Sequence, residues 1–248
     1  MSDVFEQQVQ LVSLGGPGIH RQVLYDASRI RQVSEQLFVP PPEARLDTGV
    51  DAVGRAPVVV HVYEGRQVVS RHYHRGGMVA ALLGDRYLGR RAENSRGFRE
   101  WCMLSAMKKQ GLPVPVPIAA SRIQSGPWYR ADLVTEFVPE ARTLADWLLR
   151  DTLESGLWRR IGSVIRRFHN CNVYHADLNA RNILISHSGE VVLIDFDNSR
   201  FRKTGRNWRR QNLARLQRSL HKFARLQPGF RFAAQDWQDL LAGYAAEE

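Results

Sequence analysis

Two polar clusters indicate the fold of this chain, His175-Ala176-Asp177-Leu178-Asn179-Ala180-Arg181-Asn182 and, shortly after it, Ile194-Asp195-Phe196-Asp197. Each polar cluster adjoins an apolar run of strand-forming residues, 183–185 after the first cluster and 191–194 at the second. Ser188-Gly189-Glu190 lies between the two runs and has the composition of a turn. The pattern predicts a β-hairpin that holds both clusters on rigid strands.

The spacing of the polar residues is typical of phosphoryl transfer from ATP. In the catalytic loop of protein kinases an Asp accepts the proton of the acceptor hydroxyl, and an Asn five residues later binds Mg²⁺. The Asp of a following Asp-Phe-Gly binds the metal again. Asp177, Asn182 and Asp195 have this arrangement, so we predict Asp177 as the catalytic base and Asn182 and Asp195 as Mg²⁺ ligands. Either cluster alone would also be typical of a turn or a helix cap.

Segments with the composition of strands come first along the chain, and helical segments come later. Two antiparallel hairpins are predicted at 58–73 and 118–138, with a helix at 94–110 between them. Further helices are predicted at 144–149 and 157–168, because their apolar residues recur at helical spacing.

This order predicts an α+β, two-lobed fold like that of protein kinases. We expect a small β-rich N-lobe at 49–138, a helical C-lobe at 139–248 and an ATP cleft between them. Residues 1–48 contain Gly15-Gly16-Pro17-Gly18 and Pro40-Pro41-Pro42, which interrupt regular elements. They are predicted to form an irregular N-terminal extension.

The phosphates of ATP require a cation that a carboxylate of the small lobe holds in place. Alternation along the second strand places Arg71 on the face of Val69 and Tyr73, and Glu100 on the following helix is its natural partner. We predict that Arg71 and Glu100 form this pair, with Arg71 replacing the usual Lys. Arginine can bind phosphate bidentately, but it is not equivalent to lysine. His72 and Arg75 remain alternative phosphate ligands.

Two further contributions to nucleotide binding are predicted from backbone groups. Gly54 lies in the segment 49–56 ahead of the first strand, where a glycine permits close approach of the backbone to phosphate. This segment lacks the full G-x-G-x-x-G pattern and is also compatible with an ordinary loop. The backbone groups of Glu136 and Val138, in the segment that joins the lobes, are the candidates for binding the adenine edge.

The net charge of +10 is concentrated in one segment of the 248 residues. Residues 200–225 contain ten Lys or Arg and no Asp or Glu, so the remainder balances at 35 − 10 = 25 basic against 25 acidic residues. Apolar residues at near-helical spacing predict a basic helix at about 207–226, docked by one face. Its cationic face would attract nucleic acid, anionic lipid or a polyanionic substrate, or would simply be solvated.

The composition excludes several classes of protein. A hydrophobic content of 44% is enough for a core, and no window approaches 18 consecutive apolar residues. The start at Met1 to Glu6 lacks the features of a signal peptide, so a cytoplasmic location is expected. Cys102 and Cys171 are expected to be reduced thiols.

Several motifs share their pattern with one kinase family. They are Arg71-His72-Tyr73-His74-Arg75-Gly76-Gly77, Gly111-Leu112-Pro113-Val114-Pro115, Tyr129-Arg130-Ala131-Asp132-Leu133-Val134-Thr135-Glu136 and the two clusters quoted at the outset. Over about residues 50–200 the chain thus resembles the lipopolysaccharide-core kinases of Gram-negative bacteria. Within this family the resemblance is greatest to those that act on 3-deoxy-D-manno-octulosonic acid (Kdo).

The resemblance implies transfer of phosphate from ATP, with Mg²⁺, to a sugar hydroxyl, specifically the 4-hydroxyl of Kdo on a lipid A precursor. Asp197 stands where protein kinases have Gly, and it is an accessory candidate for metal or acceptor binding. Asn179 stands where Ser/Thr kinases commonly have Lys, and Arg181 or Arg71 could supply the missing charge. Arg75 is a further accessory candidate, in addition to Asp197 and Arg181.

The acceptor implied by the resemblance also suggests a role for the basic segment 200–225. A lipid A precursor lies in the inner membrane, so this segment is expected to bind the anionic membrane surface on its cytoplasmic face, as a peripheral contact. Nucleic acid is not expected as a partner, because no nucleic-acid-reading motif is present. A heptose kinase of the same pathway and a non-catalytic kinase-like binding protein remain alternatives. The oligomeric state stays open.

Overall fold

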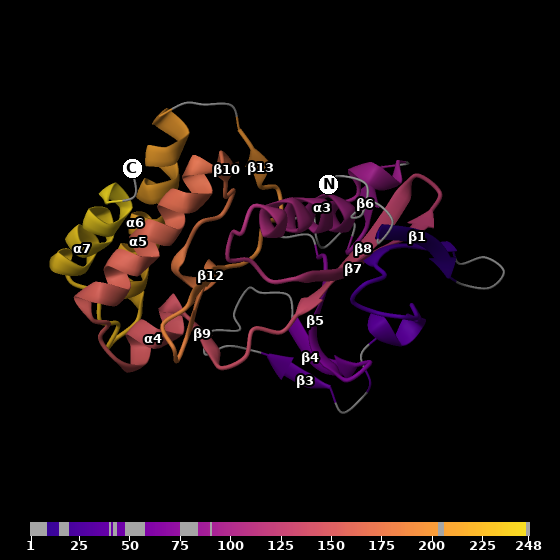
Figure 1. Cartoon of the computed structure of the whole chain (residues 1–248), viewed down its shortest axis with the longest axis horizontal. Helices are drawn as coiled ribbons and strands as arrows, with labels where there is room; N and C mark the ends of the chain where they lie inside the picture. The colour runs from indigo at the N-terminus through magenta and orange to yellow at the C-terminus, as the bar shows by residue number, and fades with distance from the viewer. Residues whose placement is uncertain are drawn as a thin grey trace. The chain divides into compact units, whose positions relative to one another are not determined.

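The computed structural model describes residues 9–14, 20–39, 41, 44–47, 58–74, 84–89, 91–202 and 206–246. The chain divides into two compact units, which fits the predicted two-lobed fold. Unit 1 comprises Met1–Ser105 and Val116–Phe137, and unit 2 comprises Ala106–Pro115 and Val138–Glu248. Unit 1 contains most of the strands and unit 2 most of the helices (Figure 1).

Unit 1 is built on one antiparallel sheet. In the described residues its strands are β1 (Val9–Leu14), β2 (His20–Asp26), β3 (Arg45–Asp47), β4 (Val58–Tyr63), β5 (Arg66–His72), β6 (Tyr87–Leu88), β7 (Pro117–Ser125) and β8 (Trp128–Glu136). They are ordered β1-β2-β7-β8-β5-β4-β3, and β6 pairs with β8. Two short 3₁₀ turns are present as well. η1 (Glu35–Leu37) lies between β2 and β3, and η2 (Ala92–Asn94) precedes the helix that begins at Arg96.

The two predicted hairpins are present in this sheet. β4 pairs with β5 so that Val58 lies opposite Arg71, and β7 pairs with β8. The turn between β4 and β5 has positive φ at Glu64 (47°) and Gly65 (74°). Such a turn matches the right-handed twist of the strands that it joins.

The prediction of an irregular extension at 1–48 was wrong for its described part. β1 and β2 form a hairpin, and β2 joins the main sheet by pairing with β7. Val23 and Tyr25 of β2 are buried, as expected for a strand that alternates. Arg21, which shares their face, is also buried and pairs with Asp132 at 3.5 Å. A charged residue at an inward position breaks the hydrophobic pattern, and this hid the strand in the sequence.

The predicted helix between the hairpins is α3 (Arg96–Lys109), which lies against the sheet (Figure 1). A Cβ added at Gly97 would lie 2.7 Å from the carbonyl oxygen of Asp132, so the start of α3 packs directly on β8. The helix ends in a Schellman motif. Gly111 donates to Lys108, and Leu112 donates to Met107 over 3.0 Å.

Unit 2 contains the helices that follow the large sheet and the predicted catalytic hairpin. Its helices are α4 (Leu144–Arg150), α5 (Ser155–Asn170), α6 (Arg206–Leu226) and α7 (Ala234–Ala245), and the 3₁₀ turn η3 covers Ala180–Asn182. Its short strands are β9 (Ala141–Thr143), β10 (Val173–Tyr174), β11 (Ile183–Ser186), β12 (Val191–Leu193) and β13 (Arg200–Phe201). β11 pairs antiparallel with β12 and β9, and β10 pairs with β13.

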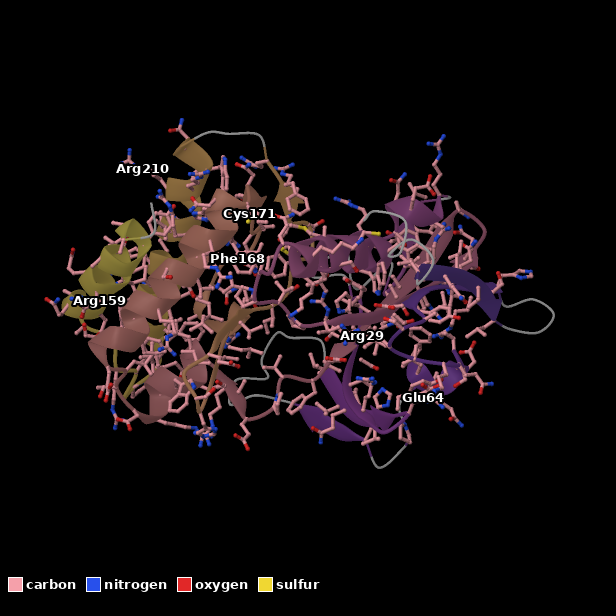
Figure 2. All side chains as sticks on the ribbon, viewed as in Figure 1. Arg29, Glu64, Arg159, Phe168, Cys171 and Arg210 are labelled. Carbon is pink, nitrogen blue, oxygen red and sulfur yellow. The ribbon has the colours of Figure 1, made fainter. Side chains whose placement is uncertain are left out.

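The helices of unit 2 pack closely around α5. A Cβ at Gly162 of α5 would lie 1.9 Å from the carbonyl oxygen of Leu240 in α7, so the two backbones are in contact there. Figure 2 shows Phe168 on the inner side of α5, where its ring stacks on Phe196 with centroids 5.7 Å apart. Arg159 lies on the side of α5 that faces α7 (Figure 2). α5 therefore connects the outer helix to the core behind the catalytic loop.

The basic segment 200–225 contains the predicted helix. α6 corresponds to the expected basic helix and buries Trp208, Leu216 and Leu220 on one face. Both cysteines are free thiols. No helix in the described part of the chain is both long and apolar enough to cross a bilayer.

Candidate active site

His175 organises the loop that carries the predicted base. It is buried, and its Nδ1 accepts a hydrogen bond from the N–H of Asp177 over 3.1 Å. Nδ1 therefore carries no proton, and Nε2 donates to the carbonyl of Ile194 over 3.0 Å. Burial lowers the pKa of His175, which favours this neutral form. The ring links the loop before Asp177 to the strand end before Asp195.

Asn212 of α6 fixes the same loop from the other side. Its amide nitrogen donates to the carbonyl of His175 over 2.7 Å, and its amide oxygen accepts from the N–H of His175 over 3.2 Å. Asn212 is 1% exposed. The sequence-based prediction did not include it. The available signal is a polar residue in the otherwise apolar i, i+4 stripe formed by residues 208, 212, 216 and 220.

Hydrogen bonds to backbone carbonyls link the segments that carry the three residues predicted from the motif spacing. The side-chain nitrogen of Asn182 donates to the carbonyl of Asp177 over 2.9 Å. The carbonyl of Asn182 accepts from Ile194, the residue before Asp195, over 3.1 Å. Asp195 itself has φ of 64°, an unfavourable backbone conformation for a residue with a Cβ. Such strain is typical of functional sites, where it sets the direction of a side chain.

Asn182 and Asp195 are a suitable donor set for Mg²⁺. Both offer oxygen atoms, which Mg²⁺ prefers, and kinases hold this ion with few protein ligands plus substrate phosphates. Among the described residues there is no cluster of three or more His, Cys, Asp or Glu side chains that could cage a metal ion. The oxygen atoms of Asn182 and Asp195 match the ligand preference of Mg²⁺.

The carboxylate of Asp177 is held by an arginine from α6. Nε and Nη2 of Arg215 donate to Oδ1 of Asp177 over 2.9 and 2.5 Å. Both side chains are about half exposed, at 47% for Arg215 and 50% for Asp177. The sequence shows that Arg215 belongs to a basic helix, but no pattern distinguishes it from the neighbouring arginines.

In unit 1, Arg71 forms the predicted ion pair with Glu100. Nη2 of Arg71 donates to Oε2 of Glu100, whose side chain is 3% exposed. The hydroxyl of Tyr73 donates to the same Oε2 over 2.6 Å. Burial, and then the charge of Glu100, raise the pKa of Tyr73, so its hydroxyl remains a donor. The carboxylate that orients Arg71 is thus itself held in place.

Both ring nitrogens of His72, the alternative phosphate ligand, contact carboxylates. Its Nδ1 lies 2.6 Å from Oδ1 of Asp132, and its Nε2 lies 3.1 Å from Oδ2 of Asp85. The hydrogen bond to Asp132 is the main reason that the pKa of His72 is raised. These contacts favour a structural role for His72. The alternative ligand Arg75 lies outside the described residues.

The remaining predicted residues are placed as follows. The N–H of Glu136 donates to the carbonyl of Val116 over 2.8 Å, so this N–H already has a partner within unit 1. Val138, at the start of the second part of unit 2, is partly buried. Gly54 lies outside the described residues. The backbone roles predicted for Glu136 and Val138 stay predictions.

The accessory residues differ in their surroundings. Asp197 is partly buried, and its Oδ2 accepts from the side-chain amide of Asn198 over 3.2 Å. The guanidinium of Arg181 lies over the ring of Phe223 in α6, 5.0 Å from its centroid. Asn179 caps η3 by accepting from the N–H of Arg181 over 2.8 Å. Asn179 thus has a structural role where many kinases have a cation.

Comparisons with known proteins show to which family the chain is similar. The model of the lipopolysaccharide kinase (Kdo/WaaP) family matches residues 47–244. A 3-deoxy-D-manno-octulosonic acid kinase of Actinobacillus succinogenes is 43% identical over 185 residues, which are 73% of this chain and 76% of that protein. Proteins of the same name from Xylella fastidiosa and Xanthomonas euvesicatoria are 38% and 40% identical. The matches cover 82% of both chains for the former, and 81% of this chain and 80% of its relative for the latter.

Proposed function

The chain belongs to the lipopolysaccharide kinase (Kdo/WaaP) family, and we propose that it transfers the γ-phosphate of ATP to a hydroxyl of Kdo on a lipid A precursor. The names of the relatives support Kdo as the acceptor sugar. The observation that carries the proposal is the constellation of Asp177, Asn182 and Asp195, joined through the backbone of the hairpin. We assign the 4-hydroxyl as the site of phosphorylation on the strength of the family resemblance.

Asp177 acts as the base in this proposal. It accepts the proton of the acceptor hydroxyl as that oxygen forms a bond to the γ-phosphorus, while the bond to the oxygen bridging the β- and γ-phosphates breaks and ADP leaves. The N–H of Asp177 is bound to His175, and its carbonyl is bound to Asn182, so the backbone that carries the carboxylate is fixed. A fixed base reduces the entropic cost of reaching the reactive geometry.

Asn182 and Asp195 would hold Mg²⁺, which would supply positive charge to the phosphates during transfer. Arg71 binds the phosphates of ATP in this proposal. Arg71 needs an orienting partner because its side chain is long and flexible, and Glu100 with Tyr73 provides one. The backbone of Glu136 and Val138 binds the adenine.

The test is incubation with ATP and Mg²⁺ and either a Kdo-bearing or a heptosylated lipid acceptor, followed by mass measurement and NMR of the product. One added phosphate on O4 of Kdo is expected. Phosphate on heptose alone would contradict the proposal and favour the heptose kinase. Asp177→Asn should reduce kcat about 10²- to 10⁴-fold while nucleotide still binds. Glu190→Gln, at the exposed turn of the same hairpin, is the matched control and should retain activity.

Membrane association forms the second part of the proposal. Among the side chains that the structure describes, α6 and the strand before it present six exposed cations, Arg200, Arg210, Arg215, Arg218, Lys222 and Arg225. Leu226, at the end of α6, is a large apolar side chain that is 55% exposed. A cationic face with an exposed apolar residue at its end supports binding to anionic headgroups on the cytoplasmic face of the inner membrane.

Sedimentation with lipid vesicles tests this contact. Binding to phosphatidylglycerol vesicles should weaken as salt rises, and phosphatidylcholine vesicles should bind poorly. Arg218→Gln/Lys222→Gln should weaken binding about 10- to 30-fold, since each cation near the surface contributes about 1 kcal/mol. Lys108→Gln/Arg150→Gln removes equal charge from α3 and α4 and should have little effect. Salt-independent binding, or none at low salt, would overturn the membrane proposal.

A further inference from the structure

Arg215 binds the proposed catalytic base, and the reaction steps described above give this contact no role. It lies on α6, 38 residues beyond Asp177 in the chain, and both of its donors meet the same carboxylate oxygen, Oδ1. Neither of these two bonds involves Oδ2 of Asp177. A guanidinium has five N–H donors, so two bonds to Asp177 leave it with donors for a second anion. Arg215 therefore places a positive charge beside Asp177 that can also bind a substrate anion.

The contact is also exchangeable. Both side chains are about half exposed, and exposed ion pairs contribute little to stability because water competes with them and salt screens them. An anion on a substrate could share or replace Asp177 as the partner of Arg215 at small cost. Arginine is suited to a carboxylate because its planar fork matches the two oxygens.

We propose that Arg215 binds the carboxylate of an acidic sugar acceptor, and so selects it over a neutral sugar. The inference rests on the proposed function and names the determinant of its specificity. A hydroxyl that reacts at Asp177 must lie within hydrogen-bond reach of that carboxylate. In a sugar acid such as Kdo, the acceptor's own carboxylate is then brought close to Asp177, and the two negative charges repel each other. A cation at this place relieves the repulsion, whereas a neutral sugar has no such need.

The rest of α6 extends the same surface. Arg215, Arg218, Lys222 and Arg225 recur at intervals of three and four residues, so they share one exposed face. At 1.5 Å per residue, this row begins beside the base and runs about 15 Å along the helix. Its far end suits the additional phosphates of a lipid-linked acceptor. Arg215 is the member that reaches the reacting sugar.

The alternative use of Arg215 is as a cation for the transferring phosphate, in place of the lysine that Asn179 replaces. Arg181, the nearer candidate in the sequence, has its guanidinium over the ring of Phe223. The two roles of Arg215 differ in what they depend on. A phosphate ligand acts on every acceptor alike, while an acceptor ligand requires the acceptor's carboxylate.

The experiment compares a Kdo-lipid acceptor with the same acceptor whose carboxylate is converted to the amide. Wild type should show a KM about 10- to 100-fold higher for the amide, as expected when a charge-assisted bond is lost. Arg215→Gln should raise KM for the acid by a similar factor. In this variant the KM values for the acid and the amide should be nearly equal. Arg215→Lys should recover part of the preference, and KM for ATP should stay constant throughout. Arg150→Gln, which removes an exposed arginine of α4, is the charge-matched control.

Two results would overturn the inference. If Arg215→Gln reduces turnover of acid and amide equally, the cation acts on phosphate or on Asp177. If it changes neither, Arg215 has no part in the reaction. Failure of the proposed function is seen separately, as absence of phosphate transfer by wild type to the Kdo acceptor. In that case calorimetric titration of the two acceptors decides the inference, which requires binding of the acid that the amide and Arg215→Gln both weaken.

Discussion

The carboxylate of Glu100, 3% exposed in α3, holds the guanidinium of Arg71 on β5 and also accepts from the hydroxyl of Tyr73. The guanidinium carbon lies 4.8 Å from the centre of the Tyr73 ring. A long cationic side chain is thus fixed on both sides, by a charge and by an aromatic face. This arrangement is what a residue that positions phosphates needs, because it removes rotamer freedom before the nucleotide binds.

Removal of this carboxylate tests the role of Arg71. Glu100→Gln keeps the shape but removes the charge, so Arg71 loses its orientation and KM for ATP should rise about tenfold. Glu93→Gln, at an exposed position ahead of the same helix, should leave KM unchanged. Equal KM for ATP in wild type and Glu100→Gln would remove the pair from nucleotide binding. Steady-state kinetics at saturating acceptor give the measurement.

Asn212 should contribute strongly to the stability of the catalytic loop. Asn212→Ala leaves both backbone groups of the buried His175 without their partner, which costs about 2–4 kcal/mol in the free energy of unfolding. Activity should fall as well, because Asp177 is bound to the ring of His175. Gln211→Ala changes the exposed neighbour on α6 and should have little effect. Equal urea midpoints for the two variants would contradict this prediction.

The contact between α5 and α7 predicts opposite results for two glycines of one helix. Gly162→Ala would place a Cβ 1.9 Å from the carbonyl oxygen of Leu240, so the helices must separate, at a cost of about 2–4 kcal/mol. Gly156→Ala meets no atom within 4 Å, and its free energy of unfolding should change by less than about 1 kcal/mol, towards greater stability. Thermal unfolding of both variants provides the check. A tolerated Gly162→Ala would exclude the close packing of these helices.

His169 predicts a loss of stability in mild acid. Burial lowers the pKa of His169 from 6.5 to about 4, although its bond to Asn212 opposes the shift. Nε2 faces the amide oxygen of Asn212 and Nδ1 faces the hydroxyl of Tyr244 at 2.7 Å, so the neutral ring fits both partners.

The sign of the pH dependence follows from this lowered pKa. The unfolded state binds a proton near pH 6.5 and the folded state only near pH 4, so stability is lost as pH falls between these values. The loss amounts to about 2 kcal/mol between pH 7 and pH 5. His169→Gln should be less stable at pH 7.5 but should show a flatter pH dependence in urea unfolding. Parallel curves for the two proteins would contradict the assignment.

The catalytic hairpin could be predicted because its determinants are contiguous. The apolar runs of β11 and β12, the turn at Gly189 and the polar residues at their ends lie within about twenty residues, so local pattern alone specifies their geometry. The same holds for the hairpin β4–β5 and for the end of α3 at Gly111. The pairing of Arg71 with Glu100 followed from strand alternation and helix position.

Other features depend on inward-facing polar residues, which hydrophobic patterning does not detect. Arg21 makes β2 look irregular, yet it is buried beside Asp132 on a distant strand. Asn212 lies in the apolar stripe of α6, but the stripe does not show that its partner is the backbone of His175. In each case the partner that makes burial possible is far away in the chain.

Local sequence pattern was enough to predict the kinase-like motif, the hairpin that carries Asp177, Asn182 and Asp195, and the concentration of positive charge in one helix. These depend on spacing between near neighbours and on composition. The docking of α6 became known only from the three-dimensional structure, in which Asn212 holds the catalytic loop and Arg215 binds Asp177. Local periodicity predicts which face of a helix is buried. It does not predict what that face packs against, because docking depends on side chains that are far apart in the chain.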